Sequence, residues 1–155
     1  MFTAFFSVIT IKEEEIMQVI LKSEGKLSIT GYTGEGHETK FDAPIAIGGE
    51  NSAAKPMEVM LETLGACSYI DIMSILTKMR KTIEKFEIII DAERAEEHPK
   101  VFTKVNIIYK AYSKDLKLTE LEKAVKLSQD KYCSVSAMFR NSGCTVNHTS
   151  EIVSE

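Results

Sequence analysis

The sequence has no run of lysine and arginine, which argues against nucleic acid as a partner. Its 155 residues contain 19 Lys and Arg against 23 Asp and Glu, for a formal net charge of -4. A protein that binds a phosphate backbone usually concentrates positive charge on one face. We therefore expect no nucleic-acid partner.

Cysteine is scarce, odd in number and widely spaced. The chain has three cysteines, Cys67, Cys133 and Cys144, and three histidines that form no cluster at metal-ligand spacing. This pattern fits neither a zinc knuckle nor a small disulfide scaffold. We therefore expect no metal, and the reducing cytoplasm as the location.

Glycine-rich phosphate cradles are also missing. The candidate Gly34-Glu35-Gly36 joins two short strands and is typical of a turn. The chain has no internal repeat and no low-complexity tract, and its length suits one domain. The sequence therefore indicates neither a nucleotide site nor another bound cofactor.

The first residues are apolar but lack the basic start of a secretion signal, and they are too short to span a membrane. Residues 12–17 could be encoded by a purine-rich stretch followed by a methionine codon, as a translated bacterial ribosome-binding site would be. Two interpretations stay open: residues 1–16 are an extension from a misassigned start before Met17, or they form an ordinary strand. Residues 17–155 are expected to form a single domain, with no membrane as partner.

Apolar residues are abundant over residues 55–81, which predict one long helix. Pro56 suits its first turn. The apolar positions that follow lie nearly all round the helix, so it must be buried. A chain of this size cannot easily wrap such a helix alone, and a homodimer would. Small residues flank Cys67 in its middle, so another element can approach the sulfur closely: Gly65, Ala66 and Ser68.

Strand-like runs surround this helix, and a second helical segment follows. The expected strands are residues 17–23, 26–33, 37–42, 86–94, 101–109 and 144–153, and the second helix is 118–140. The order β-β-β-α-β-β-α-β predicts an α+β fold with a mainly antiparallel sheet against two long helices. Cys133 is expected in the middle of the second helix, and Cys144 at a strand start, as an ordinary surface or edge residue.

Two cysteines on helices that pack into one core can face one another. They are either a thiol pair that closes to a disulfide or two small buried hydrophobic residues. A reactive thiol needs its pKa lowered, because the thiolate is the nucleophile. Four cations could do this, and the sequence does not choose among them: Lys55, Arg80, His37 and Arg140.

Helical geometry places the acidic neighbours of Cys67. Asp71, four residues on, shares the face of Cys67, and its carboxylate would raise the thiol pKa. Glu58, nine residues earlier, lies on the opposite face at about 100° per residue.

The chain resembles the OsmC/Ohr family of osmotically induced and organic hydroperoxide resistance proteins over about residues 17–153. The matching pieces are Pro56-Met57-Glu58-Val59-Met60-Leu61 with Gly65-Ala66-Cys67-Ser68, and Tyr132-Cys133-Ser134-Val135-Ser136. The order of the expected elements also agrees. The sequence looks closer to the OsmC-like branch than to the dedicated peroxidases.

The resemblance implies an intertwined homodimer with the two long helices at its centre and sheets outside. It implies that Cys67 is the peroxidatic cysteine, which attacks an organic hydroperoxide, and that Cys133 is the resolving cysteine. A dithiol partner, in some members a lipoylated protein, would reduce the disulfide. No metal or bound cofactor is implied.

The chain departs from the family pattern at two positions. The peroxidases use an Arg from the N-terminal strands, whereas residues 17–55 contain no Arg. They also have a Glu ten residues before the first cysteine, where this chain has Met57 followed by Glu58. Glu58 and His37 are therefore tentative supporting residues.

Two functional interpretations stay open. The first is a redox protein that reduces organic hydroperoxides through Cys67 and Cys133. The alternative is a catalytically inactive dimer that binds a small apolar ligand in its interface cavity.

Overall fold

The computed structural model describes residues 16–153, which divide into two compact units. The N-terminal unit ends at Pro56 and the C-terminal unit begins at Met57. Each is described by itself. The proposed alternative start concerns residues that lie, except for Ile16, outside the described range.

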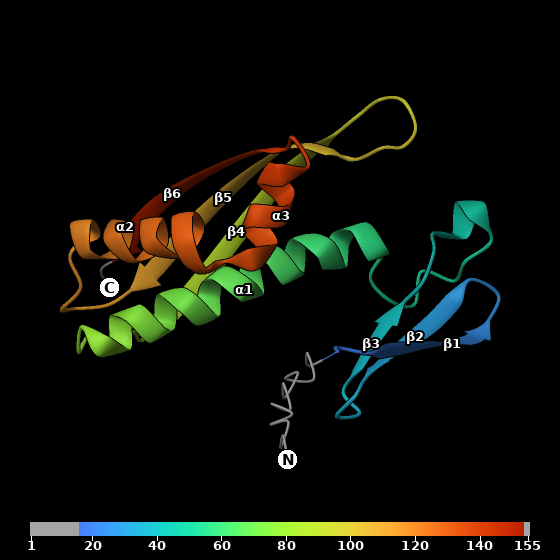
Figure 1. Ribbon diagram of the computed structural model, residues 1–155, viewed down its shortest axis with the longest axis horizontal. Helices are drawn as coiled ribbons and strands as arrows, with labels where there is room; N and C mark the ends of the chain where they lie inside the picture. Colours follow the sequence, from blue (N-terminus) through green and yellow to red (C-terminus); the bar gives the residue numbers. More distant parts are fainter. Residues whose placement is uncertain (1–15, 154–155) are drawn as a thin grey trace, which may run out of the picture. The chain divides into compact units, whose positions relative to one another are not determined.

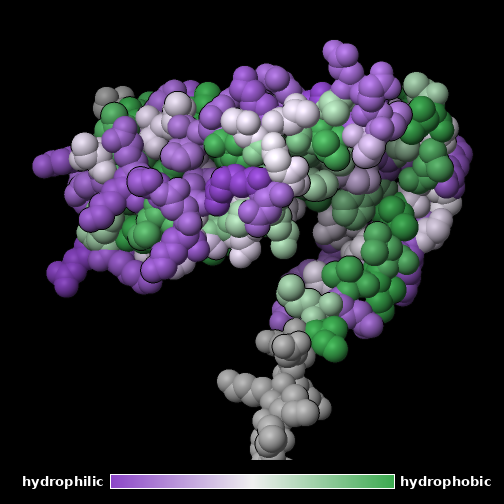
Figure 2. Space-filling model, turned by 45° about the horizontal axis from the view of Figure 1, so that its top comes forward, coloured by the Kyte–Doolittle hydropathy of each residue, from purple (hydrophilic) through white to green (hydrophobic). Residues whose placement is uncertain are grey.

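The N-terminal unit is a three-stranded antiparallel sheet in the order β1-β2-β3. Its strands are β1 (Val19–Gly25), β2 (Ser28–Thr33) and β3 (Glu38–Phe41), followed by a short 3₁₀ helix, Ile45–Ile47. These strands confirm the prediction, because no observed end lies more than two residues from the predicted one. In Figure 2, apolar side chains, in green, gather on the visible face of this unit. The exposed apolar residues that belong to it include Val19, Ile20, Leu21, Leu27, Ile45 and Ile47.

Asp42 organises the loop that leads from β3 to the C-terminal unit. Its side chain is almost fully buried, and its carboxylate accepts hydrogen bonds from the backbone N–H groups of Ala43, Glu50 and Ser52 at 2.7, 3.1 and 2.9 Å. The Ser52 hydroxyl donates a fourth bond at 2.8 Å. These bonds, with those of Ser52 the strongest, lower the pKa of Asp42 to about 2.

The C-terminal unit combines three helices with a second three-stranded sheet. The helices are α1 (Pro56–Lys78), α2 (Leu118–Leu127) and α3 (Ser134–Asn141), and the strands are β4 (Lys85–Arg94), β5 (Phe102–Tyr112) and β6 (Thr145–Val153). The sheet order is β4-β5-β6, with β4 antiparallel and β6 parallel to β5. The fold is α+β, as predicted, but its strands form two separate sheets.

The helices pack on one face of this second sheet (Figure 1). Alternate residues of β5 face them and are fully buried, among them Val105, Ile107 and Tyr109. They meet Leu64 of α1 and Leu121 of α2 in a single core. All the buried hydrophobic residues of the described range belong to this unit.

α1 is only partly buried within one chain. Within this one chain, Met60 and Ile70 on α1 are 46% and 67% exposed. Of the described helices, α1 is the one long and apolar enough to cross a membrane by length and composition, a test that core helices of globular proteins also pass. The expectation of a helix wrapped on every side is therefore not met within a single chain.

The second long helix predicted over residues 118–140 is interrupted. α2 ends at Leu127, a π-helical turn covers Ser128–Tyr132, and α3 begins at Ser134. Cys133 lies at the break with an extended backbone, φ -71° and ψ 96°, rather than in the middle of a helix. Apolar spacing runs through both pieces, and so the pattern alone did not reveal the break.

We expect Asp42→Asn to make folding stability less sensitive to acid. The ordinary pKa of an aspartate is 3.8, and Asp42 has a folded-state pKa of about 2. Its depressed pKa therefore stabilises the fold above the ordinary value, and this stabilisation disappears as the pH falls toward 2. Thermal unfolding followed by circular dichroism between pH 6 and pH 2 measures the effect.

The matched control is Asp91→Asn, because Asp91 is an exposed residue of β4. The control should keep the pH dependence of the unaltered protein. An Asp42→Asn variant with that same pH dependence would contradict the role of Asp42.

Candidate active site

Cys67, Asp71 and Cys133 come together in the C-terminal unit. Their sulfur and carboxylate atoms all lie within 4.8 Å of one another. Cys67 and Asp71 are four residues apart on α1, so they share one face of that helix. The prediction that two distant cysteines face one another is confirmed, and so is the place of Asp71 beside them.

The π-helical turn positions Cys133. The backbone N–H of Cys133 donates to the carbonyl of Ser128 at 2.8 Å, a bond across five residues. Cys133 then acts as the N-terminal cap of α3, because its sulfur accepts a hydrogen bond from the backbone N–H of Ser136 at 3.4 Å. Single π turns in helices occur often at functional sites.

The two thiols differ in their surroundings. Cys133 is only 2% exposed, whereas Cys67 is partly exposed. The pKa of Cys133 is raised to about 12, chiefly by burial and also by the neighbouring Cys67 and Asp71, although the N–H group of Ser136 lowers it. Cys133 therefore stays a protonated thiol at neutral pH.

Asp71 is held in place by a hydroxyl group. The Ser128 hydroxyl donates to Asp71 Oδ2 at 3.1 Å. Ser128 comes from the π-helical turn, so the same local break supplies both the cysteine and the group that orients the carboxylate. Sequence spacing did not identify Ser128, because the turn that brings it to Asp71 is not visible in the apolar pattern.

A buried network of hydrogen bonds holds the π-helical turn in place. Gln129 donates from Nε2 to the Tyr109 hydroxyl at 2.8 Å, and Ser136 donates to Gln129 Oε1 at 2.6 Å. Arg140 donates to Ser136 Oγ and to the Gln129 carbonyl, both at 2.6 Å. Burial, above all, raises the pKa of Tyr109 to about 12, so its phenol stays neutral. Arg140, one of the predicted activating cations, is thus held in this hydrogen-bond network by Ser136 and Gln129.

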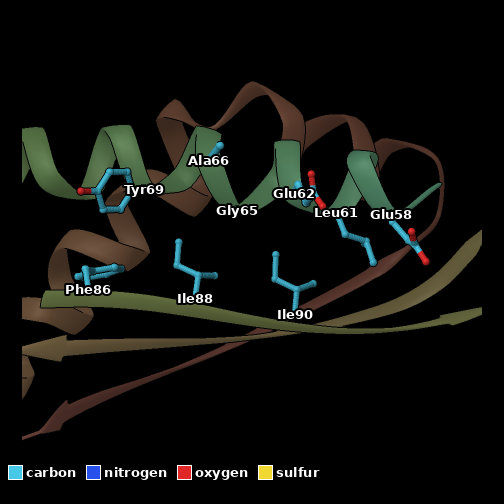
Figure 3. Close-up of a pocket in the computed structure, with 9 residues that line it drawn as sticks. All are labelled: Glu58, Leu61, Glu62, Gly65, Ala66, Tyr69, Phe86, Ile88 and Ile90. Carbon is cyan, nitrogen blue, oxygen red and sulfur yellow. The ribbon is translucent and has the colours of Figure 1, made fainter. Parts of the chain in front are cut away.

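A pocket of about 570 Å³ lies between α1 and β4 (Figure 3). Ile88 and Ile90 form its floor, and the ring of Tyr69 meets Phe86 edge-on at 5.7 Å at one end. Gly65 lets α1 lie close to β4, since a Cβ atom at this position would be only 3.2 Å from Ile90 Cδ1. The wall is mostly apolar.

Glu58 belongs to this pocket rather than to the cysteine cluster. It lies with Glu62 at the other end of the pocket from Tyr69 (Figure 3). Helical geometry placed Glu58 on the opposite face of α1 from Cys67, and the pocket lining agrees. Among the described residues of the C-terminal unit, the carboxylate beside the two sulfurs is Asp71.

The remaining candidates lie elsewhere. His37 is in the N-terminal unit, where its exposed ring pairs with Glu35 at 3.5 Å. Cys144 precedes β6, an edge strand, and is 4% exposed, so the expectation of a surface position was wrong. Its thiol packs into the hydrophobic core, and burial raises its pKa.

We expect Gln129→Leu to destabilise the C-terminal unit. Leucine would remove the amide donor to the Tyr109 hydroxyl and the acceptor of the Ser136 hydroxyl, and each buried hydrogen bond lost costs about 0.5–1.5 kcal/mol. Chemical denaturation followed by fluorescence or circular dichroism measures this loss. Asn147→Ala is the control, because its hydrogen bond to Asn106 is exposed, and it should change stability by less than about 0.5 kcal/mol. Equal stability of the two variants would contradict a structural role for the network.

Comparison with known proteins identifies the family. The profile of the family described as OsmC-like protein matches residues 49–149. Protein YhfA of Escherichia coli K12 is 35% identical over 137 residues, which cover 88% of this chain and 98% of that protein. The crystal structure of a hypothetical protein from Aquifex aeolicus VF5 is 32% identical, with a TM-score of 0.77 over 92% of this chain and 99% of that one.

A more distant structure shares the fold alone. It is an organic hydroperoxide resistance protein OsmC from Legionella pneumophila, 16% identical, with a TM-score of 0.60 over 97% of this chain and 98% of that one. The profile match and the closely related sequences together establish that this chain belongs to the OsmC-like family.

Proposed function

We propose that the protein reduces organic hydroperoxides with a pair of thiols, in which Cys67 is peroxidatic and Cys133 is resolving. The observation that carries this proposal is that the two sulfurs lie within 4.8 Å of each other although the two cysteines are 66 residues apart in sequence. Two thiols at this distance can form a disulfide with a modest rearrangement of side chains. The name of the Legionella relative supports the hydroperoxide as the oxidant.

The surroundings of the two thiols support this division of roles. Cys67 is the more exposed, so a peroxide can reach its sulfur. The Cys133 thiol is buried, and its raised pKa makes it a poor first nucleophile. Cys133 acts second, when Cys67 has become an electrophile beside it.

The proposed reaction balances with two thiols and one hydroperoxide. The Cys67 thiolate attacks the terminal oxygen of the hydroperoxide, the O–O bond breaks, and the alcohol leaves with a proton. Cys67 is then a sulfenic acid. The Cys133 sulfur attacks the Cys67 sulfur, the S–S bond forms, and the hydroxyl leaves as water with the Cys133 proton. A dithiol reductant, for which a lipoylated protein is one candidate, then restores both thiols.

Activation of Cys67 calls for groups other than Asp71, whose negative charge opposes a thiolate. We propose two supporting residues, His37 as a cation and Glu58 as a group that orients this cation rather than a source of activating charge, in a site completed by a second subunit. His37 would act as a cation only when protonated. Unchanged oxidation rates in both Glu58→Ala and His37→Ala would eliminate these two roles.

A homodimer is proposed because apolar surface remains uncovered in both units of the chain. Ile70 and Met60 of α1 are exposed, and so are Val19 and Leu21 of β1. The N-terminal sheet also contributes no buried hydrophobic residue within the described range. A second copy of the chain would bury these surfaces.

The proposed location is the cytoplasm, because its reducing conditions would keep both thiols reduced.

The pocket favours a second candidate function, the binding of a small apolar ligand. Its volume of about 570 Å³ and its Ile88, Ile90 and Phe86 lining suit such a molecule. In that case the cysteines would be inert core residues. The oxidation experiment below separates the two candidates.

We expect the single cysteine variants to divide the reaction into its steps. Cys133→Ser should accumulate a sulfenic acid on Cys67, because no thiol is left to resolve it, and Cys67→Ser should not react. Trapping with a sulfenic-acid reagent followed by mass spectrometry measures both. Cys144→Ser is the control and should form the Cys67–Cys133 disulfide normally. A Cys67→Ser protein that reduces the hydroperoxide at the original rate would contradict the assignment.

We expect Ile70→Lys to weaken the dimer. A lysine at this exposed apolar position on α1 would place a charge in the proposed interface, which costs binding free energy unless it is paired. Sedimentation velocity over a range of concentrations measures the change. Val101→Lys is the matched control, since Val101 is 50% exposed outside α1, and it should leave the dimer intact. A monomeric unaltered protein would contradict the dimer itself.

A further inference from the structure

The cluster of two thiols and one carboxylate is also the donor set of a metal site. Cys67 and Asp71 are one helical turn apart on α1, and Cys133 approaches them from the start of α3. We propose that Cys67, Asp71 and Cys133 bind a zinc ion as its three protein ligands, with water as the fourth. The spacing of the cysteines and histidines did not predict this site, because spacing rules detect ligands only when they are close in sequence.

The separation of the ligand atoms fits a tetrahedral zinc ion. A Zn–S distance of about 2.3 Å places two sulfurs about 3.8 Å apart, and Zn–O distances are slightly shorter. The three ligand atoms lie within 4.8 Å of one another, so each must move by about 1 Å or less. A movement of this size is within the range of a side-chain rotation.

The chemistry of the donors selects zinc over other common ions. Thiolates are soft ligands, which zinc accepts and which magnesium and calcium avoid. Both thiols release their protons when zinc binds, and the ion then supplies the positive charge that a carboxylate and two thiolates at this distance need between them. Arg140 does not supply it through a direct contact, since its guanidinium donates to Ser136 and to the Gln129 carbonyl.

The groups around the donors resemble the outer shell of a metal site. The Ser128 hydroxyl fixes the Asp71 carboxylate at 3.1 Å, and the Ser136 N–H donates to the Cys133 sulfur at 3.4 Å. Such partners orient ligands and stabilise the thiolate form. Cys67 is partly exposed, and so water can reach a fourth position from its side.

Zinc binding does not depend on the peroxidase proposal, because it requires only the reduced thiols. The full-length reduced protein, freed of metal, is titrated with zinc against a chromophoric chelator, and with cobalt to record its spectrum. We expect one zinc per chain, and for cobalt the thiolate charge-transfer and visible bands of a tetrahedral site. Cys133→Ser and Asp71→Asn should lose this binding, and Ser128→Ala should weaken it by roughly 10–100-fold.

Cys144→Ser is the matched control, because it removes a buried thiol outside the cluster, and it should bind zinc like the unaltered protein. Zinc should also protect Cys67 from alkylation in the unaltered protein, which tests the site without any variant. The proposal is overturned by the absence of zinc binding, by equal binding in the Asp71→Asn variant, or by unprotected Cys67. Failure of hydroperoxide reduction with intact zinc binding would count against the proposed function alone.

Discussion

The break between α2 and α3 is the feature on which the site depends. At this break one π-helical turn carries Ser128 to Asp71 and places Cys133 as the cap of α3, facing Cys67. In a continuous helix Cys133 would not have this capping role. The chain of Tyr109, Gln129 and Ser136 fixes the turn, because each of these buried polar groups has its partner there.

Two faces of α1 have different surroundings. The face of α1 toward α3 holds Cys67 and Asp71, and the face toward β4 lines an apolar pocket with Glu58 at one end. The same helix therefore offers a polar, thiol-bearing face and a surface suited to an apolar molecule.

Much of the fold could be predicted from the sequence, because strand alternation and apolar density are local signals. The order of elements and the long helix from Pro56 follow from such signals, and the resemblance to the family rested on the segments around Cys67 and Cys133. The break at Cys133 could not be predicted, since apolar spacing continues across it. Ser128 and Gln129 were missed for the same reason: their roles come from a turn, not from a motif. The exposed face of α1 agrees with the expectation that one chain of this size cannot wrap the helix, but periodicity does not tell which molecule covers that face.

The central claim is that Cys67 and Cys133 form a redox pair that acts on organic hydroperoxides. The most direct test is mass spectrometry of the reduced protein after one equivalent of an organic hydroperoxide, with hydrogen peroxide as the comparison. The account predicts rapid formation of a Cys67–Cys133 disulfide, faster with the organic oxidant. Two free thiols after hours of exposure would contradict it and would favour ligand binding in the pocket beside α1.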